Sequence, residues 1–302
     1  MYIYIKETKR DEELIKNIDR PIWIKNIIIK LKKIFNIIVE KELDKSHILY
    51  IIPKVKNIDK IRKIIEKNRK AQIILSKDLK KYEKQICKES KNKTLRYYIY
   101  DILKFLLNKI NRKIELENIY ILANQYNDSN LEVMNYLIDK VKTVNIVTNN
   151  IKKYKQYEEN VYEKEGIILT VTNNKNKSLR NAKYIINLDF LEENIVKYKI
   201  NRNAIIINCA SEKIEKLNCF EGIIINNIEI GLEEKEELKE LYKEFEKLEM
   251  YESIENKEIK YKKYIEQIKK DKIEIKALIG NNGKISLKEI VNVQNKCENF
   301  TK

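Results

Sequence analysis

Residues 118–132 read NIYILANQYNDSNLE, and this stretch decides which fold the chain is predicted to adopt. Asn118 to Leu122 are predicted to form a short buried strand. Ser129 and Glu132 have the spacing of an S-x-x-E capping box, which predicts a helix from about residue 130 onward. A second apolar strand is predicted at 143–148. The succession of strand, tight turn, helix and strand is typical of the first βαβ unit of a doubly wound parallel sheet.

The turn inside this unit has the layout of a phosphate-binding loop but none of its glycines. Glycines let the backbone turn sharply and approach a pyrophosphate closely. Side chains at Asn124, Gln125 and Asn127 would hinder that approach, and Asp128 adds negative charge where a phosphate would use the helix dipole. We therefore expect the loop to be closed by its own side chains, with Ser129 or Asp128 capping the helix.

The rest of this region continues the strand and helix alternation. Six apolar segments are predicted as strands: 118–122, 143–148, 167–172, 184–187, 204–208 and 222–227. We expect them to form a parallel sheet in the order 3-2-1-4-5-6, with strand 118–122 inside the sheet. The amphipathic segment 94–111 precedes them and is predicted as a connecting helix.

The N-terminal third is predicted to be a smaller α/β domain. Strands are expected at 2–5, 47–53 and 72–76, and helices at 12–18, 22–42, 57–68 and 78–87. The long segment 22–42 is basic and amphipathic. A helix packed on the core is the preferred interpretation, and a helix lying on a membrane surface is the alternative.

The remainder of the chain, from about Gly231, is rich in Glu and Lys and is predicted to be helical, with residues 265–278 continuing the helices. Asn282-Gly283 predicts a tight turn. The fold class is therefore α/β, with a basic domain at 1–93, a Rossmann-like parallel domain at 94–230 and a helical C-terminal segment at 231–302.

The formal net charge of +16 is unevenly distributed. Residues 1–117 carry about +15, whereas residues 231–302 balance sixteen Lys with sixteen Asp and Glu. Such asymmetry suggests an anionic partner for the N-terminal domain. Lys56, Lys60, Lys63 and Lys67 have helical spacing and form the candidate polyanion-binding face, although a solvated basic surface explains the same pattern.

Several classes of function are disfavoured by the residues present. The four cysteines show no CxxC spacing and His47 is the only histidine, so zinc and iron–sulfur patterns are absent from the sequence. Cys87 is interpreted as a small core residue. No P-loop, HExxH or GxSxG motif occurs, and no catalytic residue is assigned. Without a signal peptide or a long apolar span, we expect a cytoplasmic protein, and an oligomer is compatible with the sequence.

Residues 94–230 resemble the nucleotide-binding half of the shikimate dehydrogenase, glutamyl-tRNA reductase and methylene-tetrahydrofolate dehydrogenase group. The likeness lies in the succession ENIYILANQYNDSNLEVMNYLIDKVKTVNIVTNN, GIILTV, SLRNAKYIINL, NAIIINCA and GIIINN. The resemblance implies a dinucleotide-binding fold. It says less about activity, because one fold serves many functions.

The resemblance also implies positions for a cofactor. Ala123, Asn124, Gln125 and Ser129 would belong to the phosphate loop. Asn149 and Lys152 would face the adenine ribose, where an acidic residue often holds the hydroxyls of NAD. No cofactor is assigned, but NADP is expected over NAD if a dinucleotide binds. Lys175, with Lys177 and Arg180 nearby in sequence, is the best internal candidate for an anion contact.

Three functions remain open from the sequence. The leading hypothesis is a non-catalytic binding or regulatory pseudoenzyme with a degenerate dinucleotide-binding domain. The first alternative is an NAD(P)-dependent oxidoreductase with an atypical phosphate loop. The second is a polyanion-binding or nucleic-acid-binding protein, which rests on the basic N-terminal third.

Overall fold

The computed structural model describes residues 1–15, 19–53, 58–86, 94–233, 239–255 and 261–299. The chain divides into two compact units. Unit 1 contains residues 1–90 and 233–256, and unit 2 contains residues 91–232 and 257–302. The expected C-terminal segment 231–302 is therefore shared between the two units.

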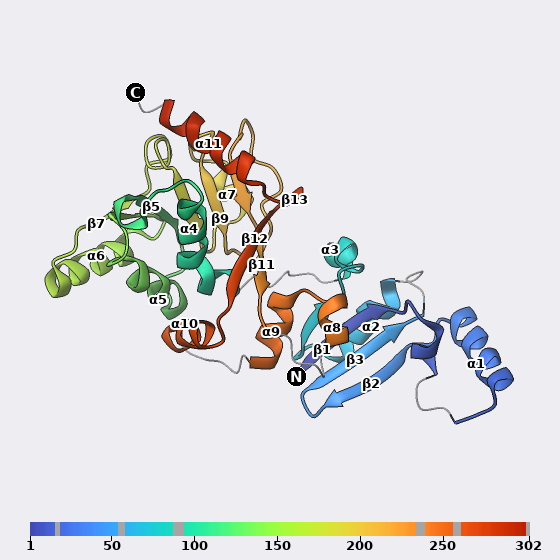
Figure 1. Cartoon of the computed structure of the whole chain (residues 1–302). Coiled ribbons are helices and arrows are strands. Elements are labelled where there is room, and N and C mark those ends of the chain that lie inside the picture. The colour runs from blue at the N-terminus through green and yellow to red at the C-terminus, as the bar shows by residue number, and fades with distance from the viewer. Residues whose placement is uncertain (16–18, 54–57, 87–93, 234–238, 256–260, 300–302) are drawn as a thin grey trace. The chain divides into compact units, whose positions relative to one another are not determined.

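Unit 2 is built on a six-stranded parallel sheet (Figure 1). Its strands are β5 (Asn118–Leu122), β6 (Thr143–Val147), β7 (Leu169–Thr172), β8 (Tyr184–Asn187), β9 (Ile205–Asn208) and β10 (Ile223–Ile225). They lie in the order β10-β9-β8-β5-β6-β7, and every neighbouring pair is parallel. The predicted order 3-2-1-4-5-6 is confirmed, with β5 and β8 adjacent at the point where the winding reverses.

Helical segments precede or connect these strands. They are η3 (Thr94–Tyr98), α4 (Ile99–Asn108), η4 (Ile114–Leu116), α5 (Asp128–Leu137), α6 (Ile151–Glu165) and α7 (Glu192–Ile195). The connector predicted at 94–111 is thus a 3-10 turn followed by a shorter α-helix. Helix α6 ends at Gly166, whose φ of +67° is a left-handed conformation that glycine adopts without strain.

The last part of unit 2 contains strands that the sequence analysis missed. Strands β11 (Asn227–Gly231), β12 (Glu274–Gly280) and β13 (Gly283–Lys284) form an antiparallel sheet, and α10 (Tyr261–Lys270) and α11 (Leu287–Asn299) flank β12 and β13 in sequence. The prediction that residues 265–278 continue a helix holds as far as Lys270 and is wrong beyond it, because the chain enters β12 at Glu274. A tight turn does join β12 to β13, but its central residues are Asn281 and Asn282, and Gly283 is the first residue of β13.

Unit 1 contains a four-stranded mixed sheet in the order β2-β3-β1-β4. Its strands are β1 (Tyr2–Glu7), β2 (Val39–Asp44), β3 (His47–Ile52) and β4 (Gln72–Leu75), and β2 alone runs antiparallel to its neighbour. Its helical segments are η1 (Asp11–Leu14), α1 (Ile22–Ile34), α2 (Ile58–Lys67), η2 (Lys80–Tyr82), α3 (Glu83–Ile86), α8 (Lys239–Glu244) and α9 (Lys247–Glu255).

The helix predicted at 22–42 is longer than the observed α1, which ends at Ile34. Asn36 has a φ of +48°, a left-handed conformation that ends the helical run, and the following residues pair as β2 with β3. By contrast, α2 packs as expected. Within α2, Ile61 is buried in a cluster that includes the strand residues Ile52 and Leu75. Ile64 and Ile65 of the same helix pack against this cluster. None of the described helices is long and apolar enough to cross a bilayer.

Candidate functional site

The loop that follows β5 is held by a carboxylate from another part of the chain. The backbone N–H of Asn124 donates to Asp189 Oδ1 at 2.7 Å, and the N–H of Gln125 donates to Oδ2 at 2.8 Å. The side-chain amide of Asn130, which is buried in α5, donates to the same Oδ2 at 2.8 Å. Three donors therefore converge on one side chain, in the region where a phosphate loop presents its backbone N–H groups.

Asp189 reaches this loop because of the sheet order. Strand β8 lies beside β5, with Asn187 paired to Leu122, and the N–H of Leu188 continues the ladder to the carbonyl of Leu122. Asn187 Oδ1 then accepts from the N–H of Phe190, which forms the turn that contains Asp189. Sequence analysis did not identify Asp189. The available signal was an acidic residue two positions beyond the fourth strand, in YIINLDF.

The start of α5 differs from the predicted capping box. Asn127 is the N-cap, and its side chain accepts from the backbone N–H of Asn130 at 2.9 Å. Asp128 and Ser129 lie in the first turn of the helix, and the Ser129 hydroxyl contacts Arg96. The expectation that Ser129 or Asp128 caps the helix is therefore wrong. The loop is closed by Asp189 together with its own side chains.

The loop that follows β6 is joined to the first loop. The N–H of Asn149 donates to Asn124 Oδ1 at 2.8 Å, and Tyr154 in α6 donates to the carbonyl of Gln125 at 2.8 Å. Burial, assisted by the Asp189 carboxylate, raises the pKa of Tyr154, so this phenol stays a donor at neutral pH. The structure thus brings together four predicted cofactor positions, Ala123, Asn124, Gln125 and Asn149. The hydrogen bonds given above for Asn124, Gln125 and Asn149 all go to other residues of the protein.

The predicted cations are placed differently. Lys152 is exposed in the first turn of α6, and its neighbour Lys153 lies with its ammonium 5.9 Å from the ring centre of Tyr126. Lys175 is exposed in the connection between β7 and β8. Among the described residues, no hydrogen bond or ion pair joins Lys152 or Lys175 to the loop after β5.

A ladder of asparagines closes the carboxyl ends of the next three strands. Asn187 donates to Asn208 Oδ1, Asn208 donates to Asn226 Oδ1 and Asn226 donates to Asn281 Oδ1, at 2.8, 2.8 and 2.7 Å. The first three side chains are buried. Because each amide is satisfied by the next, this edge of the sheet is sealed at the place where ligands of doubly wound sheets bind.

The candidate polyanion-binding face of unit 1 is only partly available. The Lys60 ammonium donates to the carbonyls of Phe35 and Asn36 at 2.9 and 3.0 Å, where it satisfies the end of α1. Lys63 and Lys67 are exposed on α2, and Lys56 lies outside the described residues. Lys60 is therefore engaged within unit 1, and polyanion binding by this face stays a prediction.

Unit 1 also contains a cluster of partly buried ionisable side chains that the sequence did not indicate. Lys80 pairs with Glu249 from α9 and lies 3.4 Å from Glu83. Burial raises the pKa of Glu249 to about 7 despite the lysine, and burial raises the pKa of the neighbouring Glu252 further above its usual range.

His47, the only histidine of the chain, packs against a tyrosine ring in unit 1. His47 begins β3, stacks on the Tyr2 ring at 5.3 Å and lies with Nε2 3.0 Å from the Ser253 carbonyl. Cys87 falls outside the described residues. Within the described part of the chain, no group of three His, Cys, Asp or Glu side chains is placed to hold a metal ion.

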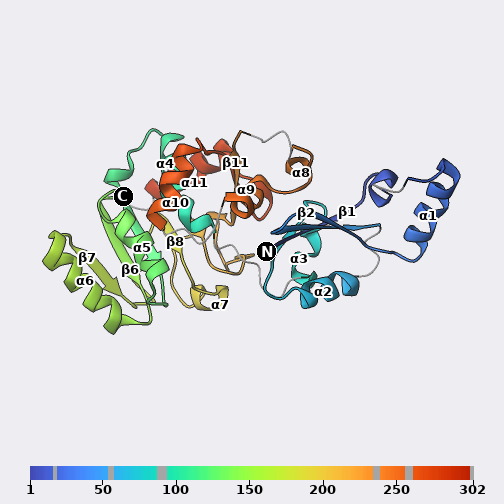
Figure 2. The ribbon, with the colours of Figure 1, turned by 90° about the horizontal axis from the view of Figure 1, so that it is seen from below.

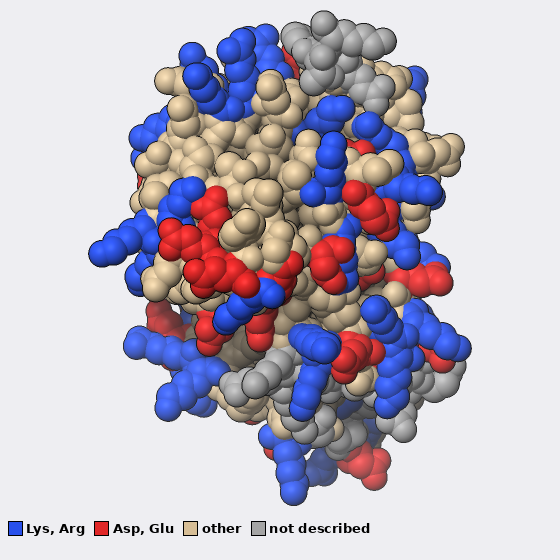
Figure 3. Space-filling view, turned by 90° about the vertical axis from the view of Figure 1, so that its left-hand side faces the viewer, with Lys and Arg blue, Asp and Glu red and all other residues tan. Residues whose placement is uncertain are grey.

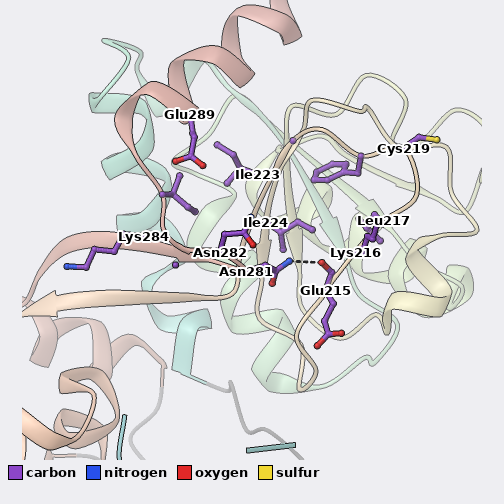
Figure 4. Close-up of a pocket in the computed structure, with 15 residues that line it drawn as sticks. Glu215, Lys216, Leu217, Cys219, Ile223, Ile224, Asn281, Asn282, Lys284 and Glu289 are labelled. Carbon is purple, nitrogen blue, oxygen red and sulfur yellow. Dashed lines mark hydrogen bonds between the residues drawn. The ribbon is translucent and has the colours of Figure 1, made fainter. Parts of the chain in front are cut away.

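Unit 2 includes two pockets whose lining residues are all described. The first, of about 330 Å³, is lined from the β9–β10 connection and the β12–β13 hairpin, and Figure 4 shows the Asn281 amide bonded to the Glu215 carbonyl at its centre. The second, of about 540 Å³, is lined by three cations, Arg180, Lys199 and Arg202, beside the rings of Tyr198 and Phe220. No carboxylate lines the second pocket in the described structure.

Comparisons with known proteins add little to this geometry. No protein-family model matches the chain, and no curated protein matches it. Among solved structures, the chain is similar to L-tryptophan dehydrogenase from Nostoc punctiforme, with 11% sequence identity and a TM-score of 0.36 over 99% of this chain and 87% of that chain. A likeness this remote carries no argument about function. The Rossmann-like α/β fold rests on the order and direction of the chain's own strands.

Proposed function

We propose that this chain is a non-catalytic binding or regulatory protein built on a Rossmann-like domain whose phosphate loop is occupied by Asp189. The observation that carries the proposal is the pair of hydrogen bonds from Asn124 and Gln125 to the Asp189 carboxylate. These are the donors that a pyrophosphate would need. A dinucleotide would have to displace an internal anion and then tolerate its charge nearby.

The asparagine ladder and the linked loops support the same proposal. A catalytic site in a doubly wound sheet needs polar groups that are free to contact a substrate at the carboxyl edge. Here the amides of Asn187, Asn208 and Asn226 bond to one another, and Asn124 bonds to the neighbouring loop. The polar groups at this edge therefore hold the protein together.

Titration calorimetry with NAD and NADP tests the proposal. We expect no binding by the unaltered chain, because Asp189 holds the loop. Asp189→Ala removes the charge and frees two N–H groups, so it should gain weak phosphate binding. Asp189→Asn is the matched control, since it keeps the shape of the side chain without the charge. Micromolar binding of NADP by the unaltered chain would instead favour the oxidoreductase alternative.

For the ligand of such a binding protein we propose a small anion that carries an apolar or aromatic part. The second pocket supports this choice because two of the chain's eight arginines, Arg180 and Arg202, line it together with Lys199. Arginine binds phosphate and carboxylate in a bidentate manner. Tyr198 and Phe220 offer ring surface beside these cations, and the volume lies within the range of small-molecule sites.

A thermal-shift series with pyrophosphate and nucleoside monophosphates tests this site. We expect nucleoside monophosphates to stabilise the chain more than pyrophosphate does, because only they fill the aromatic part. Arg180→Gln with Arg202→Gln should remove the shift. Lys216→Gln, an exposed cation lining the other pocket, is the control and should keep it. If the ligand shifts the melting temperature of both variants equally, the stabilisation comes from general charge, and binding at this pocket is contradicted.

A further inference from the structure

Helix α1 exposes an apolar surface that the rest of its unit does not cover. Among the described residues, seven of the thirteen exposed large apolar side chains fall between residues 22 and 37. We define the outer stripe of α1 as Trp23, Ile27, Leu31 and Ile34, which are 65%, 48%, 45% and 73% exposed. Clustered exposure of this kind marks an interaction surface, whereas single exposed apolar residues do not.

The outer stripe occupies one side of the helix. Residues three or four apart share a face, and the spacing of the four residues follows that pattern. Ile29, the buried residue of α1, lies on the opposite side. Figures 1 and 2 both place α1 at the margin of its unit, away from the faces of the four-stranded sheet. The helix therefore packs through Ile29 and presents the stripe to the surroundings.

Contacts on the packed side fix this orientation. The Lys32 ammonium donates to the carbonyl of Leu14 at 2.7 Å, and Lys33 pairs with Asp11 at 2.6 Å. At the end of the helix, Lys60 holds the carbonyls of Phe35 and Asn36. These bonds hold α1 to η1 and α2, and the outer stripe remains exposed.

The positive charge of α1 limits which kinds of partner can cover the outer stripe. Helix α1 contains four lysines and no acidic residue, and the exposed Lys30 borders the stripe. A second copy of the chain would bring a second basic helix, with its own Lys30, to the contact, and like charges oppose that pairing. A nucleic acid would satisfy the lysines but leave the apolar side chains in water. An anionic lipid surface satisfies both, because headgroups pair with lysine and the acyl boundary takes the apolar side chains.

We propose that α1 binds the surface of anionic lipid bilayers, with the outer stripe inserted at the headgroup boundary. This inference stands on α1 alone and does not depend on the proposed function of unit 2. Trp23 is the only tryptophan of the chain and sits in the stripe, which suits the interfacial region where tryptophan is favoured. Binding is expected to weaken as salt rises, because part of the attraction is electrostatic.

Fluorescence of Trp23 tests the proposal in the full chain. We expect its emission to shift to shorter wavelength with vesicles of equal parts phosphatidylglycerol and phosphatidylcholine, and not with pure phosphatidylcholine. Brominated lipid should quench it, since the ring would lie near the acyl boundary. Unchanged emission with the anionic vesicles would overturn the proposal.

Paired variants separate the stripe from general basic charge. Ile27→Ser with Leu31→Ser should lower vesicle affinity at least about tenfold, because apolar area is lost from the bilayer contact. Since both side chains are exposed, the unfolding transition should stay unchanged. The control is Lys63→Glu with Lys67→Glu on α2, which alters unit 1 charge outside α1 and should lower affinity much less.

The remaining outcomes contradict the inference. Equal vesicle binding by the Ile27→Ser and Leu31→Ser variant would show that the stripe is not the contact. Greater loss in the α2 variant would assign binding to the basic surface in general. If the stripe substitutions instead convert a dimer into a monomer, and the unaltered chain ignores vesicles, the stripe is an interface between two copies.

Discussion

At the scale of single residues, the buried side-chain amide of Asn208 at the end of β9 bonds to Asn187 on one side and to Asn226 on the other. It accepts from Asn187 and donates both to Asn226 and to the carbonyl of Glu212. A buried polar group is tolerated only when its hydrogen bonds are complete. The ladder therefore stabilises the fold. Substituting one of its amides should lower the free energy of unfolding more than substituting a surface amide does.

Substitution of Asn208 by Ala should lower the free energy of unfolding by about 2 to 3 kcal/mol, because bonds to buried amides on both sides are lost. Urea unfolding followed by circular dichroism measures the change. Asn218→Ala is the matched control, since that side chain is exposed, and it should change the value by less than about 0.5 kcal/mol. Equal effects of the two substitutions would mean that the ladder adds nothing to stability.

At the scale of elements, the entry into α5 shows how one cap orders a loop. Asn127 has extended backbone angles, and its side chain receives the N–H of Asn130, the residue whose amide reaches Asp189. Capping and loop closure are therefore coupled through Asn130. The helix begins two residues closer to the strand than it would with Ser129 as its cap.

Asn127→Ala should destabilise unit 2 by about 1 kcal/mol, the usual effect of losing an N-cap. Asp128→Ala is the comparison, because Asp128 lies in the first turn and contributes only its charge to the dipole, about 0.3 to 1 kcal/mol at low salt. Salt should therefore reduce the Asp128 effect and leave the Asn127 effect nearly unchanged. The reverse dependence on salt would contradict the assignment of Asn127 as the cap.

At the scale of the whole molecule, unit 1 is completed by a segment far along the chain. Residues 233–256 return to the unit formed by residues 1–90, and α9 brings Glu249 and Glu252 against Lys80. Basic side chains do not dominate every face of the molecule (Figure 3). On the face in Figure 3, basic and acidic side chains are interspersed with uncharged ones.

The buried carboxyl of Glu252 in α9 should make unit 1 less stable as the pH rises. Burial raises the pKa of Glu252 in the folded chain, so the folded state keeps a proton that the unfolded state loses above about pH 4.5. The stabilising effect is complete below that pH and is lost as the pH rises toward the folded pKa. Each such group changes the free energy of unfolding by about 1.4 kcal/mol per pH unit within this window.

Amide hydrogen exchange of β1 measures this dependence in unit 1. Glu252→Gln replaces the neutral acid with an amide of similar shape, so protection should fall less steeply between about pH 5 and pH 7 than in the unaltered chain. Glu240→Gln is the control, because that carboxylate is on the surface and its pKa is lowered by Lys243. An identical pH slope for Glu252→Gln and the unaltered chain would show that Glu252 is ionised in the folded state.

What the sequence alone determined is the local pattern and, through it, the parallel sheet of unit 2. Strand 118–122 has the predicted bounds, and regularly spaced apolar strands are sufficient to predict the order around it. Those signals are local, because burial on both faces requires apolar runs bounded by polar turns.

The tertiary structure alone decided which polar side chains meet. Asp189 reaches a loop more than sixty residues earlier in the chain, and Lys60 caps a helix that ended at residue 34. Strands β2 and β12 form by pairing with distant or antiparallel partners, although charged residues interrupt their apolar pattern. Strand propensity and side-chain contacts of this kind depend on the partner that the fold supplies, and no short stretch of sequence records that partner.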